Sequence, residues 1–142
     1  MIALIVLVLA FFLLLALVMY GVGLYNGLIR LSMNVSKAWA NIDVLLKQRY
    51  DEIPKLVKVC QGYMQHERQT LEKITAARSA CMSAQGVGQT ARAEGQLSAT
   101  LKTLFAVAEN YPDLKSNQSF IQLQQRVSYL ENQIADRREF YN

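Results

Sequence analysis

Residues 2 to 25, IALIVLVLAFFLLLALVMYGVGLY, contain no charged side chain and set the organisation of the rest of the chain. As a helix rising about 1.5 Å per residue, this segment would extend roughly 36 Å, enough to cross a hydrocarbon layer of about 30 Å. A cleaved signal peptide would need a basic start, a shorter apolar run and a small-residue cleavage site, and these features are missing. The segment therefore predicts a transmembrane anchor over residues 1–25, in contact with a lipid bilayer.

Every charged residue follows this apolar segment. No Asp, Glu, Lys or Arg precedes Arg30, and 15 cations and 11 anions occupy the remainder of the 142 residues. Cations next to a span favour the cytoplasmic side, which predicts an N-terminus outside and the bulk of the chain in the cytoplasm. The opposite orientation stays open, because long domains are sometimes exported despite their charge.

The formal net charge of +4 does not indicate a nucleic-acid partner. A nucleic-acid-binding surface gathers its cations into a stripe with aromatic residues, whereas here the cations alternate with acidic residues. This pattern is typical of a solvated helix face.

The residues after Tyr25 predict one long helix over residues 26–82. Apolar side chains recur at spacings of 3 and 4, the pattern of a helix that packs in coiled-coil fashion. They are Leu28, Leu31, Val35, Ala38, Ile42 and Leu45. Pro54 removes a backbone donor and clashes with the carbonyl of Tyr50, which predicts a kink near residues 50–54. In the alternative interpretation the helix breaks there, and Pro54 lies in the first turn of a new helix.

Two shorter helices follow. The segment SAQGVGQT, residues 83–90, has two glycines and predicts a turn. A helix is then expected over 91–110, ending before Pro112, and another over 116–142 with Ser116 or Asn117 as its N-cap. The predicted fold class is all-α, with residues 26–142 forming an antiparallel bundle.

The expected helix lengths leave part of this bundle uncovered. A helix over 26–82 would extend roughly 85 Å, against about 30 Å and 40 Å for the two later helices. An apolar seam around Trp39, Ile42 and Leu45 would then face water unless further C-terminal residues or neighbouring copies of the chain cover it, and we predict a homo-oligomer. With Tyr50 and Tyr63, these residues are the candidate interface, since large rings often dominate interfaces. The alternative is that they belong to the intramolecular core.

The sequence offers little for catalysis or metal binding. His66-Glu67 begins like the zincin pattern H-E-x-x-H, but position 70 is Thr and the chain has one histidine. Cys60 and Cys81 would lie roughly 31 Å apart on a single helix, beyond disulfide reach. The acidic residues Asp43, Asp51 and Glu52 have basic neighbours at helical spacing, which indicates ion pairs, with Lys47–Asp51 and Asp51–Lys55 as the expected ones. We therefore expect no enzyme, no metal and no cofactor.

Two segments carry residues typical of a known family in a specific order. The first is YNGLIRLSMNVSKAWANIDVLLKQRYDEIPKLVKVCQGYMQHERQTLEKITAARSA, residues 25–80, and the second is YPDLKSNQSFIQLQQRVSYLENQIADRREFYN, residues 111–142. The features that match are Tyr25-Asn26, Arg30, Ala38-Trp39, Ile42-Asp43-Val44, Leu46, Arg49, Ile53-Pro54, Leu56-Val57, Gly62-Tyr63, His66-Glu67, Thr70-Leu71 and Ala77-Arg78. Together they resemble the LemA family. That resemblance implies a bacterial envelope protein with an N-terminal anchor, a bundle of long helices, a further C-terminal tail, and no established reaction.

These observations favour a non-catalytic scaffold in the bacterial cytoplasmic membrane that self-associates through its long helices. The alternative is an accessory subunit of a membrane protease or transporter. A third class is an enzyme whose cysteines or carboxylates act between copies of the chain.

Overall fold

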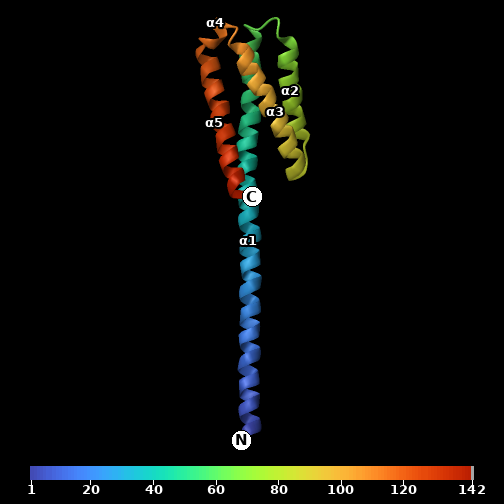
Figure 1. Ribbon diagram of the computed structural model, residues 1–142, viewed down its shortest axis with the longest axis vertical. Coiled ribbons are helices and arrows are strands. Elements are labelled where there is room, and N and C mark those ends of the chain that lie inside the picture. The colour runs from blue at the N-terminus through green and yellow to red at the C-terminus, as the bar shows by residue number, and fades with distance from the viewer. Residues whose placement is uncertain (142) are drawn as a thin grey trace. The chain divides into compact units, whose positions relative to one another are not determined.

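The computed structural model describes residues 1–141, with side chains described as far as Glu139. Over these residues the secondary structure is helical, with no strand, which confirms the predicted all-α class. The helices are α1 (Ile2–Gln61), α2 (Arg68–Ser83), α3 (Gly86–Ala108), α4 (Pro112–Lys115) and α5 (Gln118–Tyr141) (Figure 1). The expected helix end at Asn142 lies outside the described residues.

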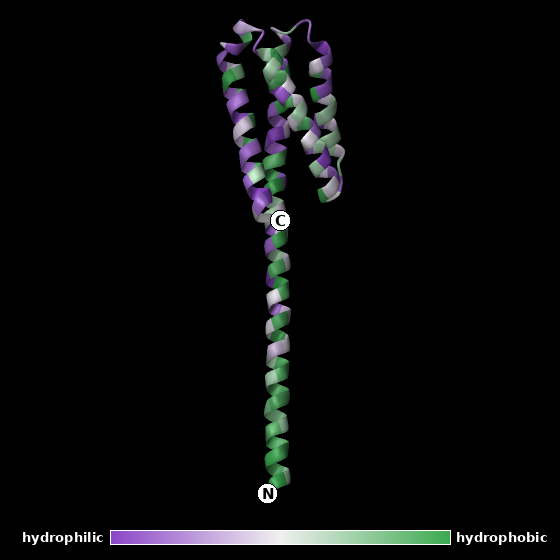
Figure 2. Ribbon diagram, in the orientation of Figure 1, coloured by the Kyte–Doolittle hydropathy of each residue, from purple (hydrophilic) through white to green (hydrophobic). Residues whose placement is uncertain are grey.

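The chain divides into two compact units, Met1–Asn41 and Ile42–Phe140. The first unit is the N-terminal part of α1. Its first 25 residues carry no charged side chain and are mostly apolar, so that green prevails toward the N-terminus in Figure 2, and all of them are exposed. By length and composition this helix could cross a membrane. The expected domain boundary at residue 25 does not coincide with the division of contacts at residue 41.

The second unit, which we call the bundle, has a continuous apolar core. Residues 42–61 of α1 are accompanied by α2, α3 and α5, with α4 in the connection between α3 and α5 (Figure 1). The core contains the residues that the sequence places at spacings of 3 and 4, because one face of each helix is turned inward. Its fully buried members are Ile42, Ile53, Leu56, Cys60, Ile74, Leu97, Leu104, Leu114 and Val127.

The first long helix ends at Gln61, 21 residues earlier than expected. The chain turns at residues 62–67, where the N–H groups of Tyr63 and Met64 both donate to the carbonyl of Cys60. A single helix over 26–82 is therefore wrong. The apolar spacing continues through the turn because Met64, although outside a helix, is 1 % exposed and fills the core at the expected position.

The alternative of a helix break near residues 50–54 is wrong, because α1 continues through Pro54, which lies in its interior. The connection between α2 and α3 is shorter than the expected loop over residues 83–90, since α3 begins at Gly86 and not at residue 91. Gly86 has a φ of +78°, a left-handed conformation that glycine adopts without strain, and the Gln89 side chain accepts a hydrogen bond from the Gln85 N–H. A tight two-residue connection therefore replaces the predicted loop.

The start of α5 agrees with the sequence. The side-chain oxygen of Asn117 accepts a hydrogen bond from the Phe120 N–H at 3.1 Å, which is the arrangement of an N-cap. The second of the two predicted caps is thus confirmed.

The earlier turn also covers the apolar seam that was expected to be open. With the reversal at residue 62, the 24 residues of α5 run back along α1 for roughly 36 Å, which reaches the level of Ile42. Ile42 is 0 % exposed and Leu45 is half-buried. The expectation that the seam at these two residues needs a second chain is therefore corrected.

Candidate functional site: a buried ionic centre

Arg49 lies at a position of α1 that the helical spacing assigns to the core. It follows Ile42 and Leu46 and precedes Ile53 on the same face, at steps of 4, 3 and 4 residues. Glu94 occupies the equivalent place on α3, between Thr90 and Leu97. Both charged residues are therefore folded inward with their apolar neighbours, and each is 2 % exposed.

The Arg49 guanidinium connects α1 with α3 and α5. Its Nη1 lies 2.7 Å from Oε2 of Glu94, and its Nη2 donates to Oγ of Ser98 at 2.9 Å. The same Nη2 lies 3.6 Å from Oε2 of Glu131 on α5, whose side chain is 36 % exposed. We call Arg49, Glu94, Ser98 and Glu131 the ionic centre.

Two neutral polar groups adjoin the ionic centre. Burial raises the pKa of Tyr50 well above its ordinary value, and Glu94 raises it further. Burial also raises the pKa of Cys81 to about 12, with a further contribution from the Glu94 charge. A negative carboxylate disfavours a second negative charge beside it, so both groups stay protonated at neutral pH.

The ionic centre is suited to fixing the packing of the bundle. Arg49 Nε and Glu94 Oε1 are buried without a hydrogen-bond partner in the described part of the chain, which lowers the net stability that the pair supplies. A buried pair of this kind contributes more to selecting one helix register than to raising stability. Any shift of α3 along α1 would leave two buried charges without their partners. We infer that it holds three helices in a single alignment.

A second polar contact explains why Pro54 does not break α1. Proline has no N–H, so the carbonyl of Tyr50 loses its intrahelical donor. In the structure, Nε of Arg78 on α2 donates to that carbonyl at 2.7 Å. We call this contact the proline clasp, and it replaces the missing helical hydrogen bond with one that joins α1 to α2.

The predicted interface residues have different surroundings. Ile42 and Tyr50 are buried in the core of the bundle, at 0 % and 8 % exposure, as in the alternative interpretation. Leu45 and Trp39 are half-buried. Tyr63, at 39 % exposure, accepts a hydrogen bond from Nδ2 of Asn117 at 3.0 Å. The four of these residues that belong to the bundle therefore do not share one exposed surface, because Ile42 and Tyr50 are buried and only Tyr63 is exposed.

The ionic centre was not predicted, although the sequence contains its signal. In the sequence, Arg49 and Glu94 each occupy a position that helical spacing assigns to the buried face of a helix. The expected pairs of Asp51 with Lys47 and with Lys55 are wrong for the described residues, because Lys47 pairs with Asp43 at 3.0 Å and Lys55 with Glu52 at 3.1 Å, both at the surface. A charged residue of opposite sign at a core position on each of two helices is the pattern that predicts a buried ion pair.

Cys60 and Cys81 lie on different helices, contrary to the expectation of one helix, because the chain reverses at residues 62–67. Both are free and buried, and burial raises the pKa of each thiol to about 12. Exposed His66 lies in the turn. Among the described residues, no cluster of three or more His, Cys, Asp or Glu could hold a metal ion.

The raised thiol pKa values predict alkaline unfolding. The unfolded thiols ionise near pH 9.0, whereas the folded ones stay neutral up to about pH 12. The contribution of these thiols to the free energy of unfolding is therefore fully present below about pH 9. It is lost as the pH rises toward 12, because the thiols of the unfolded state release their protons first. Circular dichroism melts at several pH values should show this decline, and it should shrink when Cys60 is replaced by alanine. A pH-independent melting temperature between pH 8 and 11 would contradict it.

The protein is all-α. It combines an apolar N-terminal helix of membrane-spanning length with a helical bundle that encloses a buried ionic centre. A profile of the LemA family matches residues 38–142. The chain belongs to the LemA family, which confirms the resemblance found in the sequence. A relative is Protein LemA of Metamycoplasma hominis, 31 % identical over 123 residues, which are 85 % of this chain and 56 % of that protein. The chain thus matches just over half the length of this relative.

Proposed function

We propose that the protein is a membrane-tethered, non-catalytic scaffold that self-associates through the part of α1 next to the apolar segment. The observation that carries this proposal is a row of exposed apolar side chains, namely Leu28, Leu31 and Val35, at 66 %, 62 % and 43 % exposure. We call these three residues the juxtamembrane stripe. Their spacing of 3 and 4 is that of the seam of a coiled coil, which needs a partner helix to exclude water.

The charges around the juxtamembrane stripe favour a second copy of this chain as the partner. In a heptad that contains the stripe, the flanking positions next to a seam are held by uncharged residues such as Ser32 and Asn34. Arg30 and Lys37 fall on the outer side of the helix. Identical helices can therefore lie parallel without repulsion between like charges, and copies anchored in one membrane in the same orientation are parallel already.

The apolar N-terminal segment supplies the tether in this proposal. Its residues from Ile2 to Tyr25 are exposed, uncharged and long enough to span a bilayer. The cations that begin at Arg30 favour an N-terminus outside and a bundle in the cytoplasm, with the bacterial cytoplasmic membrane as the location.

The chemistry of the bundle supports a scaffold over an enzyme. The Arg49–Glu94 pair is enclosed between helices, and the thiols of Cys60 and Cys81 are neutral at physiological pH. A thiol needs to be ionised to act as a nucleophile. The second candidate, an accessory subunit of a membrane protease or transporter, would use the same tether but would not require self-association.

An aspartate in the juxtamembrane stripe is expected to break the assembly. Leu31→Asp would place a charge in the seam of every copy, and like charges held together without water are strongly unfavourable. Native mass spectrometry of the full chain from lipid nanodiscs should show several chains per particle before the change and one chain after it. Met33→Asp is the matched control, since Met33 is 50 % exposed but lies on the outer side of the helix. Equal assembly sizes for the Leu31 and Met33 variants would refute the seam.

A further inference from the structure

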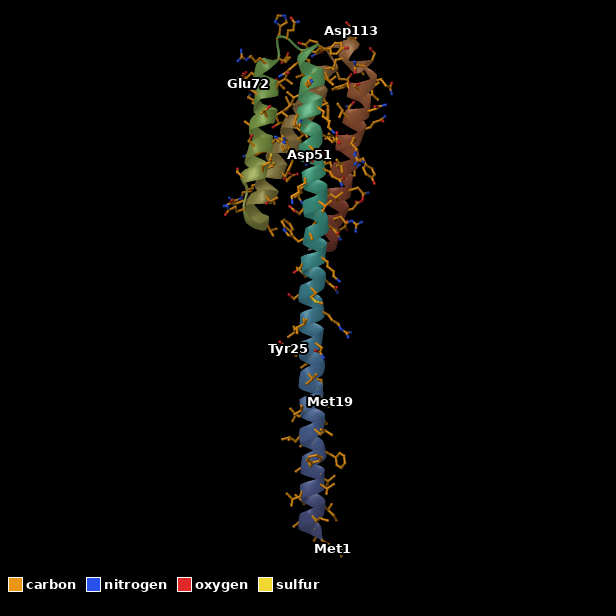
Figure 3. The ribbon with its side chains drawn as sticks, turned by 180° about the vertical axis from the view of Figure 1, so that it is seen from behind. Met1, Met19, Tyr25, Asp51, Glu72 and Asp113 are labelled. Carbon is orange, nitrogen blue, oxygen red and sulfur yellow. The ribbon has the colours of Figure 1, made fainter. Side chains whose placement is uncertain are left out.

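We propose that a groove between α1 and α2 binds an acidic amphipathic helix of a second protein. The groove has two sections, of about 710 Å³ and about 410 Å³, which share the side chains of Val57, Gln61 and Thr75. In Figure 3, α2 with the labelled Glu72 and α1 with the labelled Asp51 stand beside each other on the viewer's side. The two sections therefore form one continuous α1–α2 groove, and it lies wholly within the bundle.

The shape of the α1–α2 groove suits a helix. Its walls are two neighbouring helices, and the α2 wall runs from Arg68 to Ser79, roughly 17 Å or three helical turns. Val57, Met64 and Leu71 contribute apolar atoms to the floor, while the rims are polar. An amphipathic helix binds in such a groove by placing its apolar face on the floor and its polar side chains at the rims.

The charge of the smaller section selects an acidic occupant. Lys58 from α1 and Arg78 from α2 both line it, and no acidic residue does. The larger section is neutral by comparison, because its Arg68 is paired with Glu72 at 2.8 Å. Lys58 makes no ion pair within the described part of the chain. One end of the α1–α2 groove is therefore lined by two cations, neither of which makes an ion pair with a described residue.

Arg78 is positioned to receive a carboxylate. Its Nε is held by the carbonyl of Tyr50 at 2.7 Å, which fixes the plane of the guanidinium. Its two terminal nitrogens make no other hydrogen bond or ion pair with a described residue. A fixed guanidinium with free terminal N–H groups binds carboxylates in a bidentate manner at little entropic cost. The proline clasp thus supplies the missing hydrogen bond of α1 and also orients the Arg78 guanidinium in the α1–α2 groove.

The test uses two synthetic helical peptides of about 18 residues, long enough to fill the groove. Both have a leucine and alanine face, flanked by glutamates in one peptide and by glutamines in its twin. Binding to the full chain in phosphatidylcholine nanodiscs is followed by fluorescence anisotropy, with empty nanodiscs subtracted. We expect the glutamate peptide to bind about tenfold more tightly than its twin, and Lys58→Glu to remove that difference.

Lys73→Glu provides the control, because Lys73 is an exposed cation of α2 that lines a different surface, shared with α3. It should leave the preference for the glutamate peptide intact. Equal binding of the two peptides, no binding of the glutamate peptide, or an equal loss in the Lys58 and Lys73 variants would overturn the proposal. So would displacement of the peptide by phosphatidylglycerol, which would assign the cations to lipid headgroups. None of these outcomes depends on self-association, which is read separately from the mass of the particle.

Discussion

Replacing Glu94 with alanine is expected to destabilise the bundle by about 3–5 kcal/mol, because it would leave a buried guanidinium without its counter-charge. Arg49 is 2 % exposed and cannot reach water without separating α1 from α3. Glu131, at 3.6 Å and at the edge of the bundle, compensates only in part. The measurement is the free energy of unfolding from guanidinium titrations in mild detergent, followed by circular dichroism.

Two controls separate the buried charge from a general effect of losing a carboxylate. Asp43→Ala removes an acid whose pair with Lys47 is exposed, and should cost less than about 1 kcal/mol. The double change Arg49→Met with Glu94→Leu replaces both charges by apolar groups, and should recover most of the stability lost in Glu94→Ala. If Glu94→Ala were no more costly than Asp43→Ala, the ionic centre would not hold the bundle together as described.

The second large effect is expected at the proline clasp. Arg78→Ala would leave the carbonyl of Tyr50 without a donor, since Pro54 cannot supply one, and the cost should be about 1–3 kcal/mol. The free energy of unfolding under the same conditions gives the value. Arg92→Ala is the control, because Arg92 is an exposed arginine of α3 and should contribute less than about 0.5 kcal/mol.

A double-mutant cycle tests the cause of this effect. In a Pro54→Ala background, the alanine N–H can donate to the carbonyl of Tyr50, so the loss of Arg78 should cost at least about 0.5 kcal/mol less than in the original chain. The same cost in both backgrounds would show that Arg78 stabilises the bundle by some other contact. The cycle also reports on the α1–α2 groove, since the clasp fixes the guanidinium that we place in it.

The helical content and the apolar N-terminal helix could be predicted because they depend on local properties. The charge-free residues 2–25 and the apolar spacings are present in the sequence whatever the rest of the chain does. The Asn117 cap is equally local, since its partner is the N–H three residues later. Such features need no knowledge of which helices are neighbours.

The errors at residues 50–67 have tertiary causes. Pro54 leaves the Tyr50 carbonyl without a helical donor, and the group that pairs with this carbonyl, Arg78, is 28 residues away on another helix. The turn at Gly62 was hidden because Met64 keeps the apolar spacing while leaving the helix. The missed turn moved the expected helix end by 21 residues, from 61 to 82, and this produced the incorrect open seam at Ile42 and Leu45.

The interface prediction depended on the position of that reversal. Once α5 reaches the level of Ile42, the burial of this residue and of Tyr50 is accounted for within the chain. The exposed apolar row for which we propose a partner is nearer the N-terminus, at Leu28, Leu31 and Val35. Exposed apolar side chains remain the basis for the proposed self-association, but they lie at residues 28–35 and not at residues 39–45.

The most direct test of the scaffold proposal is the number of chains per particle for the unaltered protein, measured by native mass spectrometry from lipid nanodiscs. The exposed juxtamembrane stripe and its uncharged flanks predict a discrete particle with two or more copies. A single chain per particle at every protein-to-nanodisc ratio would contradict self-association.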